Sequence, residues 1–145
     1  MKRAAPHEFV RERRGVLDAG VLIGRLDPGR RSHDEISELL ARGARGGVSL
    51  YLSVVNLAEV LQHSRDYVKA TGVDPVSLLE GFRIAVHVPD VDLARRVAEL
   101  ASLRDTSLAD RFAAATAEAL GARLYTTDSA LAAALKPRRL AVTLF

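Results

Sequence analysis

Short apolar runs alternate with stretches of helical periodicity along most of this chain. The run that ends at Asp18 and the run 48–52 have the character of buried strands, since they are apolar and rich in β-branched or aromatic residues. Between them, Ile36, Leu39 and Leu40 recur at the three- and four-residue spacing of an amphipathic helix. The pattern as a whole predicts strands at 16–18, 48–52, 84–88, 122–125 and 140–145.

Helices are predicted where a capping residue precedes apolar periodicity. Asp74 and Ser107 stand at two such starts, and Gly121 follows the Ala-rich stretch as a stop signal. The predicted helices cover 19–24, 54–61, 75–82, 93–100, 107–120 and 129–135. A further helix starts at Ser32 and ends in the glycines Gly43, Gly46 and Gly47, and the helix 54–61 carries Val54, Leu57, Ala58 and Leu61 on one face.

Strands that alternate with helices favour an α/β fold with a parallel sheet covered on both faces. We therefore predict a three-layer α/β/α arrangement around a mainly parallel sheet of about five strands. The 145 residues fit one domain. We assign 15–145 to that domain and describe 1–14 as a basic leader.

Composition and charge narrow the possible functions. The chain has no cysteine, which excludes disulfides and thiolate zinc sites, and it has no apolar stretch long enough to span a membrane. These features predict a cytoplasmic protein. The net charge is +3, and all but three of the 21 basic residues are arginine, a composition that permits a nucleic-acid partner but does not prove one.

Three pairs of arginines are candidates for contacts with RNA phosphates. The pairs are Arg30 with Arg31, Arg42 with Arg45, and Arg138 with Arg139. Solvated surface is the alternative for each. Aromatic residues make up 5% of the chain and do not cluster with these pairs, so no platform for stacking bases is predicted.

Three aspartates occupy positions that bring them to one edge of the predicted sheet. Asp18 and Asp128 each follow a strand, and Asp110 lies in the first turn of the Ala-rich helix. The carboxyl ends of parallel strands share an edge with the helix starts that follow them, and ligands bind there. Each aspartate has an alternative role as a helix cap, and Asp110 completes a capping box with Ser107.

Glu59 has no capping role, because it lies two turns into a helix among apolar residues. A partly buried carboxylate there needs a cation or takes up a proton, and a salt bridge to an arginine is the structural alternative. Four carboxylates in one pocket repel each other unless a divalent cation lies between them, and Mg²⁺ and Mn²⁺ prefer oxygen ligands. A metal held in this way suits phosphodiester hydrolysis.

Four segments together resemble the PIN-domain family, and within it the small VapC-type toxin ribonucleases. The segment 17–23 is similar to the family's opening strand with its first acid, and the segments 53–60, 107–117 and 125–128 are similar to those that carry the other three acids. The likeness covers nearly all of residues 16–145. One departure is that Ala19 and Gly20 follow the first acid, where many members have Ser, Thr or Asn.

The resemblance implies a PIN fold and a Mg²⁺- or Mn²⁺-dependent endoribonuclease. It also implies an RNA substrate, a homodimer and inhibition by a cognate antitoxin of a toxin–antitoxin pair. By the same resemblance, the metal-binding and catalytic residues would be Asp18, Glu59, Asp110 and Asp128, with Thr126 supporting the site. The apolar helices between residues 36 and 82 are the natural place for an interface with a partner.

Two other classes of function remain open. One is a receiver-like signalling module, which also gathers acids at a sheet edge, and the other is a PIN-like scaffold that binds RNA or a protein without catalysis. The four histidines show no paired zinc-ligand spacing. His63 follows Glu59 by one helical turn and could approach the site, and Asp105 could add a carboxylate at its rim, although an exposed position suits both better.

Overall fold

The computed structural model describes residues 13–145, so residues 1–12 of the predicted basic leader lie outside the described residues. Five parallel strands form one sheet in the order β3-β2-β1-β4-β5. The strands are β1 (Arg14–Leu17), β2 (Ser49–Ser53), β3 (Ala85–His87), β4 (Arg123–Thr126) and β5 (Val142–Leu144). The predicted α/β class and parallel sheet are confirmed.

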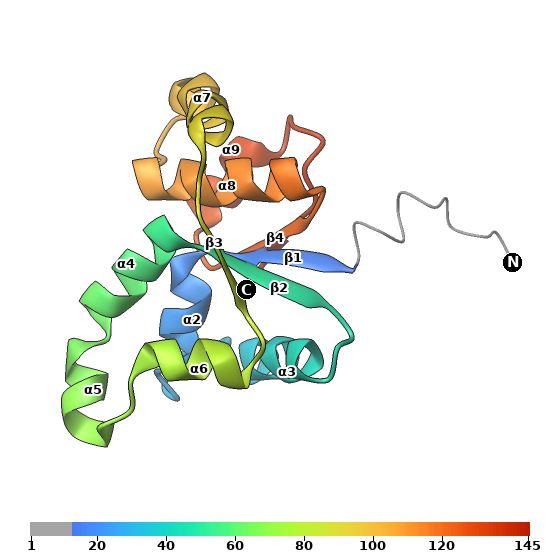
Figure 1. The fold of residues 1–145 in the computed structure, drawn as a ribbon. Coiled ribbons are helices and arrows are strands. Elements are labelled where there is room, and N and C mark those ends of the chain that lie inside the picture. The colour runs from blue at the N-terminus through green and yellow to red at the C-terminus, as the bar shows by residue number, and fades with distance from the viewer. Residues whose placement is uncertain (1–12) are drawn as a thin grey trace, which may run out of the picture.

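Helices cover both faces of the sheet and give three layers (Figure 1). One face carries α2 (Ala19–Arg25), α3 (His33–Ala44), α4 (Val54–His63), α5 (Arg65–Thr71) and α6 (Pro75–Gly81). The other carries α7 (Val91–Glu99), the short 3₁₀ turn η1 (Leu100–Ser102), α8 (Leu108–Leu120) and α9 (Ser129–Leu135). Within the described residues, no helix is long and apolar enough to cross a membrane.

Strand alternation divides the buried residues into two cores. Leu17 and Tyr125 point toward α2 and α3, whereas their neighbours Val16 and Leu124 point toward α7 and α8. Successive side chains of a strand face opposite sides of the sheet, so each central strand contributes to both cores. The alanines of α8 allow this helix to lie close to the sheet, and Ala113, Ala114 and Ala115 are fully buried there.

The structure corrects one prediction about the helices and adds a helix that was not predicted. The face of α4 that carries Val54 and Leu61 is not its buried face, since both side chains are 40% exposed and the buried residues are Asn56 and Val60. The helix leaves β2 directly after Ser53, and this connection fixes which side faces the sheet. The helix α5 was not predicted, because it buries no residue and therefore has no apolar stripe.

Gly43 does not end α3, contrary to the sequence prediction. It lies inside the helix, where a Cβ would come within 2.7 Å of Leu50 Cδ1, so the glycine allows close approach to β2. The chain leaves the helix at Arg45, and the next residue, Gly46, has a positive φ of 81°. Gly46 therefore supplies the left-handed backbone that follows many helix ends.

Candidate functional site

Asp18 and Thr126 meet at the carboxyl edge of the sheet because their strands are neighbours. Leu17 of β1 pairs with Tyr125 of β4, and the Asp18 amide donates to the Tyr125 carbonyl at 2.9 Å. The Thr126 hydroxyl donates to Asp18 Oδ2 at 2.8 Å, and the Ala19 amide donates to Asp18 Oδ1 at 2.8 Å. The carboxylate is only 4% exposed, so these bonds fix its orientation.

Burial raises the pKa of Asp18 from 3.8 to about 6. The hydrogen bonds from Thr126 and Ala19 lower that pKa, but the negative charges of Asp110 and Glu59 raise it further. Three carboxylates from β1, α4 and α8 therefore interact electrostatically at one place. Their mutual repulsion disfavours the charged form of Asp18.

Glu59 lies on α4 and is half-buried, as the sequence predicts. Its pKa is raised, first by burial and then by Asp110, whereas nearby His63 lowers it. Among the described residues, Glu59 forms no ion pair with an arginine, so its alternative role as a salt-bridge partner receives no support. His63 is exposed but close enough to Glu59 to act on its pKa.

Asp110 has a capping role and also lies near the other two acids. Its Oδ2 accepts a hydrogen bond from the Ser107 amide at 2.8 Å, and the Ser107 hydroxyl accepts from the Asp110 amide at 3.1 Å. The predicted capping box is therefore present. The cap holds Asp110 at the start of α8, where its charge acts on both Asp18 and Glu59.

Asp128 is placed differently from the other three acids. Its Oδ1 accepts from the amides of Ala130 and Leu131 and caps α9, so the capping role is present here too. The Asp128 amide donates to the Thr126 hydroxyl at 3.0 Å, which links this residue to Asp18 through Thr126. Asp128 is not among the groups that shift the pKa of Asp18. The exposed Asp105 is not among them either.

Asn56 has a structural role that the sequence did not predict. It is fully buried, one turn before Glu59 on α4, and its Nδ2 donates to the Ala109 carbonyl at 3.2 Å. This bond joins α4 to the first turn of α8, so it sets the positions of Glu59 and Asp110 relative to each other. A buried polar residue inside an apolar helix was the signal that could have identified it.

The departure after the first acid has a structural reason. A Cβ at Gly20 would collide with the Thr127 hydroxyl, so glycine lets α2 approach the loop after β4. Ala19 contributes a backbone amide to Asp18 instead of a side chain. The hydrogen bond to Oδ2 comes from Thr126 across the sheet.

The carboxylate donors have the right chemistry for a divalent cation. Carboxylate oxygens are ligands that Mg²⁺ and Mn²⁺ prefer, and a dication would offset the repulsion that raises the pKa of Asp18 and of Glu59. Among residues 13–145, however, no three His, Cys, Asp or Glu side chains are arranged so that they could hold a metal ion together. The Glu59 side chain makes no hydrogen bond within these residues.

Comparison with known families identifies the class of this protein. The sequence profile of the PIN domain matches residues 15–136, which is most of the chain, so the chain belongs to the PIN domain family. No curated protein matches it at a comparable level.

Several solved structures share this fold. One is the crystal structure of the Mycobacterium tuberculosis toxin VapC20, which is described as cleaving the sarcin-ricin loop. It superimposes with a TM-score of 0.63 at 18% sequence identity, and the match covers 83% of this chain and 94% of that chain. A toxin–antitoxin complex from Klebsiella pneumoniae gives 0.65 at 19% identity, with coverages of 90% and 98%. The FitAcB structure from Neisseria gonorrhoeae gives 0.61 at 21% identity, with coverages of 88% and 95%.

Proposed function

We propose that this protein is a divalent-metal-dependent endoribonuclease that hydrolyses RNA phosphodiester bonds. The observation that carries the proposal is the electrostatic coupling of Asp18, Glu59 and Asp110 at the carboxyl edge of the sheet, in a member of the PIN domain family. The mutual repulsion of these acids destabilises the metal-free fold, and Glu59 has neither a capping role nor an ion pair among the described residues. A bound divalent cation would offset this repulsion and stabilise the folded protein.

Each residue has a distinct role in the proposed site. Asp18 is the fixed metal ligand, because two hydrogen bonds orient its oxygens while their remaining lone pairs stay available. Thr126 positions Asp18, and Glu59 and Asp110 complete the ligand set by turning toward it. When bound, Mg²⁺ or Mn²⁺ polarises the scissile phosphoryl group and activates a water molecule.

Asp128 stands at the rim of this site. Its carboxylate caps α9 through one oxygen, which leaves Oδ2 free of hydrogen bonds within the described residues. We assign Asp128 a role in binding the metal or its water ligands. This role is weaker than that of the three coupled acids, because no charge interaction connects it with Asp18.

The biological role that we propose is that of the toxin in a type II toxin–antitoxin pair. Its support comes from the likeness to the Mycobacterium VapC20 toxin and to a toxin–antitoxin complex. The proposal includes a cognate antitoxin protein and a homodimer. The exposed apolar side chains of Val54, Leu61 and Val76 on α4 and α6 offer surface for such contacts.

A variant panel tests the nuclease assignment. Asp18→Asn, Glu59→Gln and Asp110→Asn should each reduce cleavage of total cellular RNA at least about a hundredfold, because each removes metal-directed charge without removing packing volume. Asp92→Asn is the matched control, since Asp92 is an exposed acid in the first turn of α7. Full activity in all three folded variants would refute the assignment. RNA binding without cleavage by the wild-type protein would favour the non-catalytic scaffold.

A further inference from the structure

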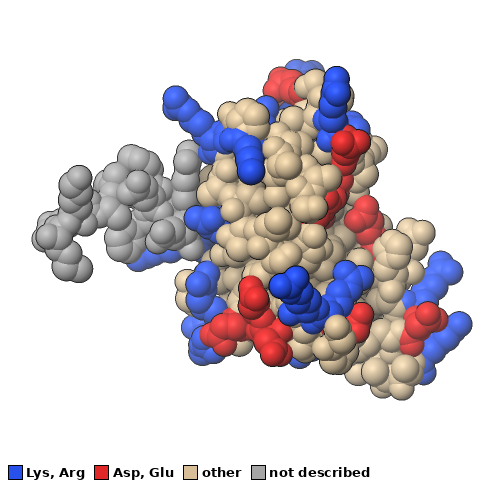
Figure 2. Space-filling view, turned by 180° about the vertical axis from the view of Figure 1, so that it is seen from behind, with Lys and Arg blue, Asp and Glu red and all other residues tan. Residues whose placement is uncertain are grey.

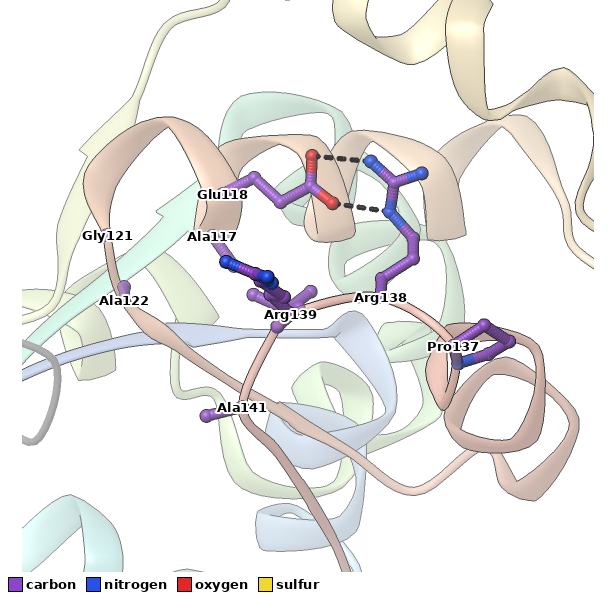
Figure 3. Close-up of a pocket in the computed structure, with 9 residues that line it drawn as sticks. Ala117, Glu118, Gly121, Ala122, Pro137, Arg138, Arg139 and Ala141 are labelled. Carbon is purple, nitrogen blue, oxygen red and sulfur yellow. Dashed lines mark hydrogen bonds and ion pairs between the residues drawn. The ribbon is translucent and has the colours of Figure 1, made fainter.

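Some arginines of this chain are paired with carboxylates, and others have no carboxylate partner among the described residues. Arg138 donates to both oxygens of Glu118, at 2.6 and 3.1 Å, and lines a cavity of about 400 Å³ at the amino end of β4 (Figure 3). Arg45 pairs with Glu38 at 3.2 Å. Arg45 and Arg138, which the sequence suggested for RNA contacts, are therefore each paired with a glutamate.

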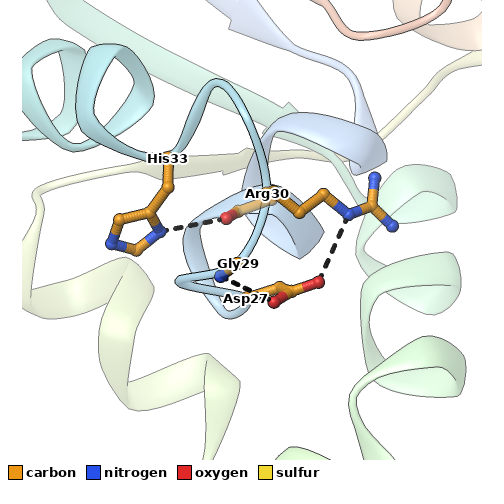
Figure 4. A network of polar contacts seen from close by, with 5 residues as sticks. Asp27, Gly29, Arg30 and His33 are labelled. Carbon is orange, nitrogen blue, oxygen red and sulfur yellow. Dashed lines mark hydrogen bonds and ion pairs between the residues drawn. The ribbon is translucent and has the colours of Figure 1, made fainter.

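In the loop before α3, Arg30 has a carboxylate partner, whereas Arg31 has none among the described residues. Asp27 accepts a hydrogen bond from the Gly29 amide and lies 3.6 Å from Arg30 Nε, while His33 bonds the Gly24 carbonyl and anchors the loop to α2 (Figure 4). Arg31 has no ion pair among the described residues. It lines a cavity of about 470 Å³ together with Thr127.

This first cavity adjoins the proposed catalytic edge. Thr127 directly follows Thr126, the residue that binds Asp18, and it packs against Gly20 at the start of α2. An RNA chain bound beside Asp18 would therefore meet this cavity at Thr127, and Arg31 lines the same cavity. The cavity also borders Phe145 at the end of β5.

A second cavity of about 730 Å³ continues from the first one along β4, β5 and α3. Phe145 and Glu35 line both cavities, so the two cavities are neighbours, and we refer to them together as the groove. Inside the second cavity, Arg42 Nη2 donates to the Tyr125 hydroxyl and Arg123 Nη1 donates to the Thr143 hydroxyl, each at 3.3 Å. Neither guanidinium has a carboxylate partner among the described residues.

The groove has a basic excess and an aromatic wall. Its lining includes five arginines and two glutamates, namely Arg13, Arg30, Arg31, Arg42, Arg123, Glu35 and Glu38. Figure 2 shows Lys and Arg side chains next to Asp and Glu side chains over the lower part of the side of the molecule opposite to that in Figure 1. Tyr125 and Phe145 both line the groove, and their rings stack on each other with centroids 6.0 Å apart.

We propose that this groove binds the single-stranded RNA substrate on one side of the cleaved bond, with Arg31, Arg42 and Arg123 contacting successive phosphates. The inference rests on the proposed function and extends it to substrate positioning. Guanidinium groups held by neutral hydroxyls keep their full charge and a fixed orientation, which suits phosphate oxygens. Continuity with the edge at Asp18 favours RNA over an acidic protein segment, because the substrate must pass that edge.

The test measures binding of a short fluorescein-labelled single-stranded RNA by anisotropy, in EDTA so that no cleavage occurs. Arg42→Gln/Arg123→Gln should weaken binding about tenfold and reduce the slope of log K against log salt by about 1.4, since each lost phosphate contact on a single strand contributes about 0.7. Arg42→Lys/Arg123→Lys should keep most of the slope, because it keeps both charges. Arg95→Gln is the matched control, on an exposed position of α7 away from the groove.

The outcomes separate the groove from the nuclease assignment. If the Gln double variant binds with wild-type affinity and slope while the wild-type protein cleaves RNA with metal, the groove inference is overturned and the nuclease stands. If Arg95→Gln loses as much slope as one groove substitution, the binding is diffuse and the groove is again rejected. Circular dichroism and thermal unfolding identify any variant that fails to fold. If the Gln double variant does, the single variants Arg42→Gln and Arg123→Gln decide the result, each with an expected slope loss of about 0.7.

Discussion

The folded structure disfavours the charged form of Asp18, although the proposed metal binding needs that charge. Its carboxylate is buried, receives two hydrogen bonds and faces two other acids, and its pKa rises to about 6. Thr126 counteracts part of this shift. The residue is thus held in one orientation at a cost in stability, as functional residues often are, and this fits the proposed metal-binding role.

Stability of the metal-free protein should fall as the pH rises. The folded-state pKa of about 6 exceeds the ordinary value of 3.8, so the folded state holds its proton more strongly and stability declines between about pH 4 and about pH 6. The loss is at most about 3 kcal/mol. Urea unfolding in EDTA on either side of this range measures it, and Asp18→Asn should abolish that part. An identical pH dependence in the variant would contradict the assignment of the shift.

Removal of the Thr126 hydroxyl should loosen Asp18. Thr126→Val deletes the 2.8 Å bond to Oδ2 and leaves the Asp128 amide without its acceptor. We expect a loss of about 1–3 kcal/mol of stability and a 10- to 100-fold decrease in Mn²⁺ affinity by calorimetry. Thr126→Ser keeps the hydroxyl and serves as the control. Unchanged affinity in Thr126→Val would show that Thr126 does not position the ligand.

At the scale of elements, the site depends on how α4 and α8 approach the carboxyl edge of the sheet. The capping box fixes the start of α8, and Asn56 ties that start to α4. Glu59 and Asp110 thus reach Asp18 from two helices that are distant in sequence. Neither Glu59 nor Asp110 belongs to the hydrophobic core.

Asn56→Ala should disturb both stability and activity. It removes the bond to the Ala109 carbonyl inside a fully buried environment, so we expect a loss of about 1–3 kcal/mol and a decrease in RNA cleavage. Ser64→Ala is the control, because Ser64 is buried and hydrogen-bonded but follows the opposite end of α4 from Asn56. If Ser64→Ala reduces cleavage as much as Asn56→Ala does, the link between α4 and α8 has no special role.

The sequence predicts the elements better than their orientation. Strand positions, the caps at Asp74 and Ser107 and the acids at strand ends follow from local chemistry, and the structure contains them. The exposed face of α4 and the groove at Arg42 depend on how distant elements pack, which local periodicity does not encode. For the same reason, the sequence does not show that Asp128, unlike Asp110 and Glu59, is absent from the groups that shift the pKa of Asp18.

At the scale of the molecule, the three layers leave apolar side chains exposed on α4 and α6. Val54, Leu61 and Val76 are each about two-fifths exposed, at 40%, 40% and 38%. They belong to the segment between residues 36 and 82 in which an interface is predicted. A homodimer or an antitoxin would cover them.

The proposed homodimer predicts a solution mass near twice 15.7 kDa. Leu61→Glu should shift light-scattering mass toward the monomer, because it places a charge on the exposed apolar face of α4. Leu144→Glu is the matched control, since Leu144 is 48% exposed on β5 at the far edge of the sheet. A dimer that survives Leu61→Glu would place the interface elsewhere.

The central claim is that the acids at the carboxyl edge form the metal-dependent site of a ribonuclease. The most direct measurement is cleavage of total cellular RNA by EDTA-treated protein before and after addition of Mg²⁺ or Mn²⁺. Discrete fragments should appear only after metal is added, and Asp18→Asn should produce none. Equal cleavage in EDTA, or metal-dependent cleavage that Asp18→Asn retains in full, would contradict the account.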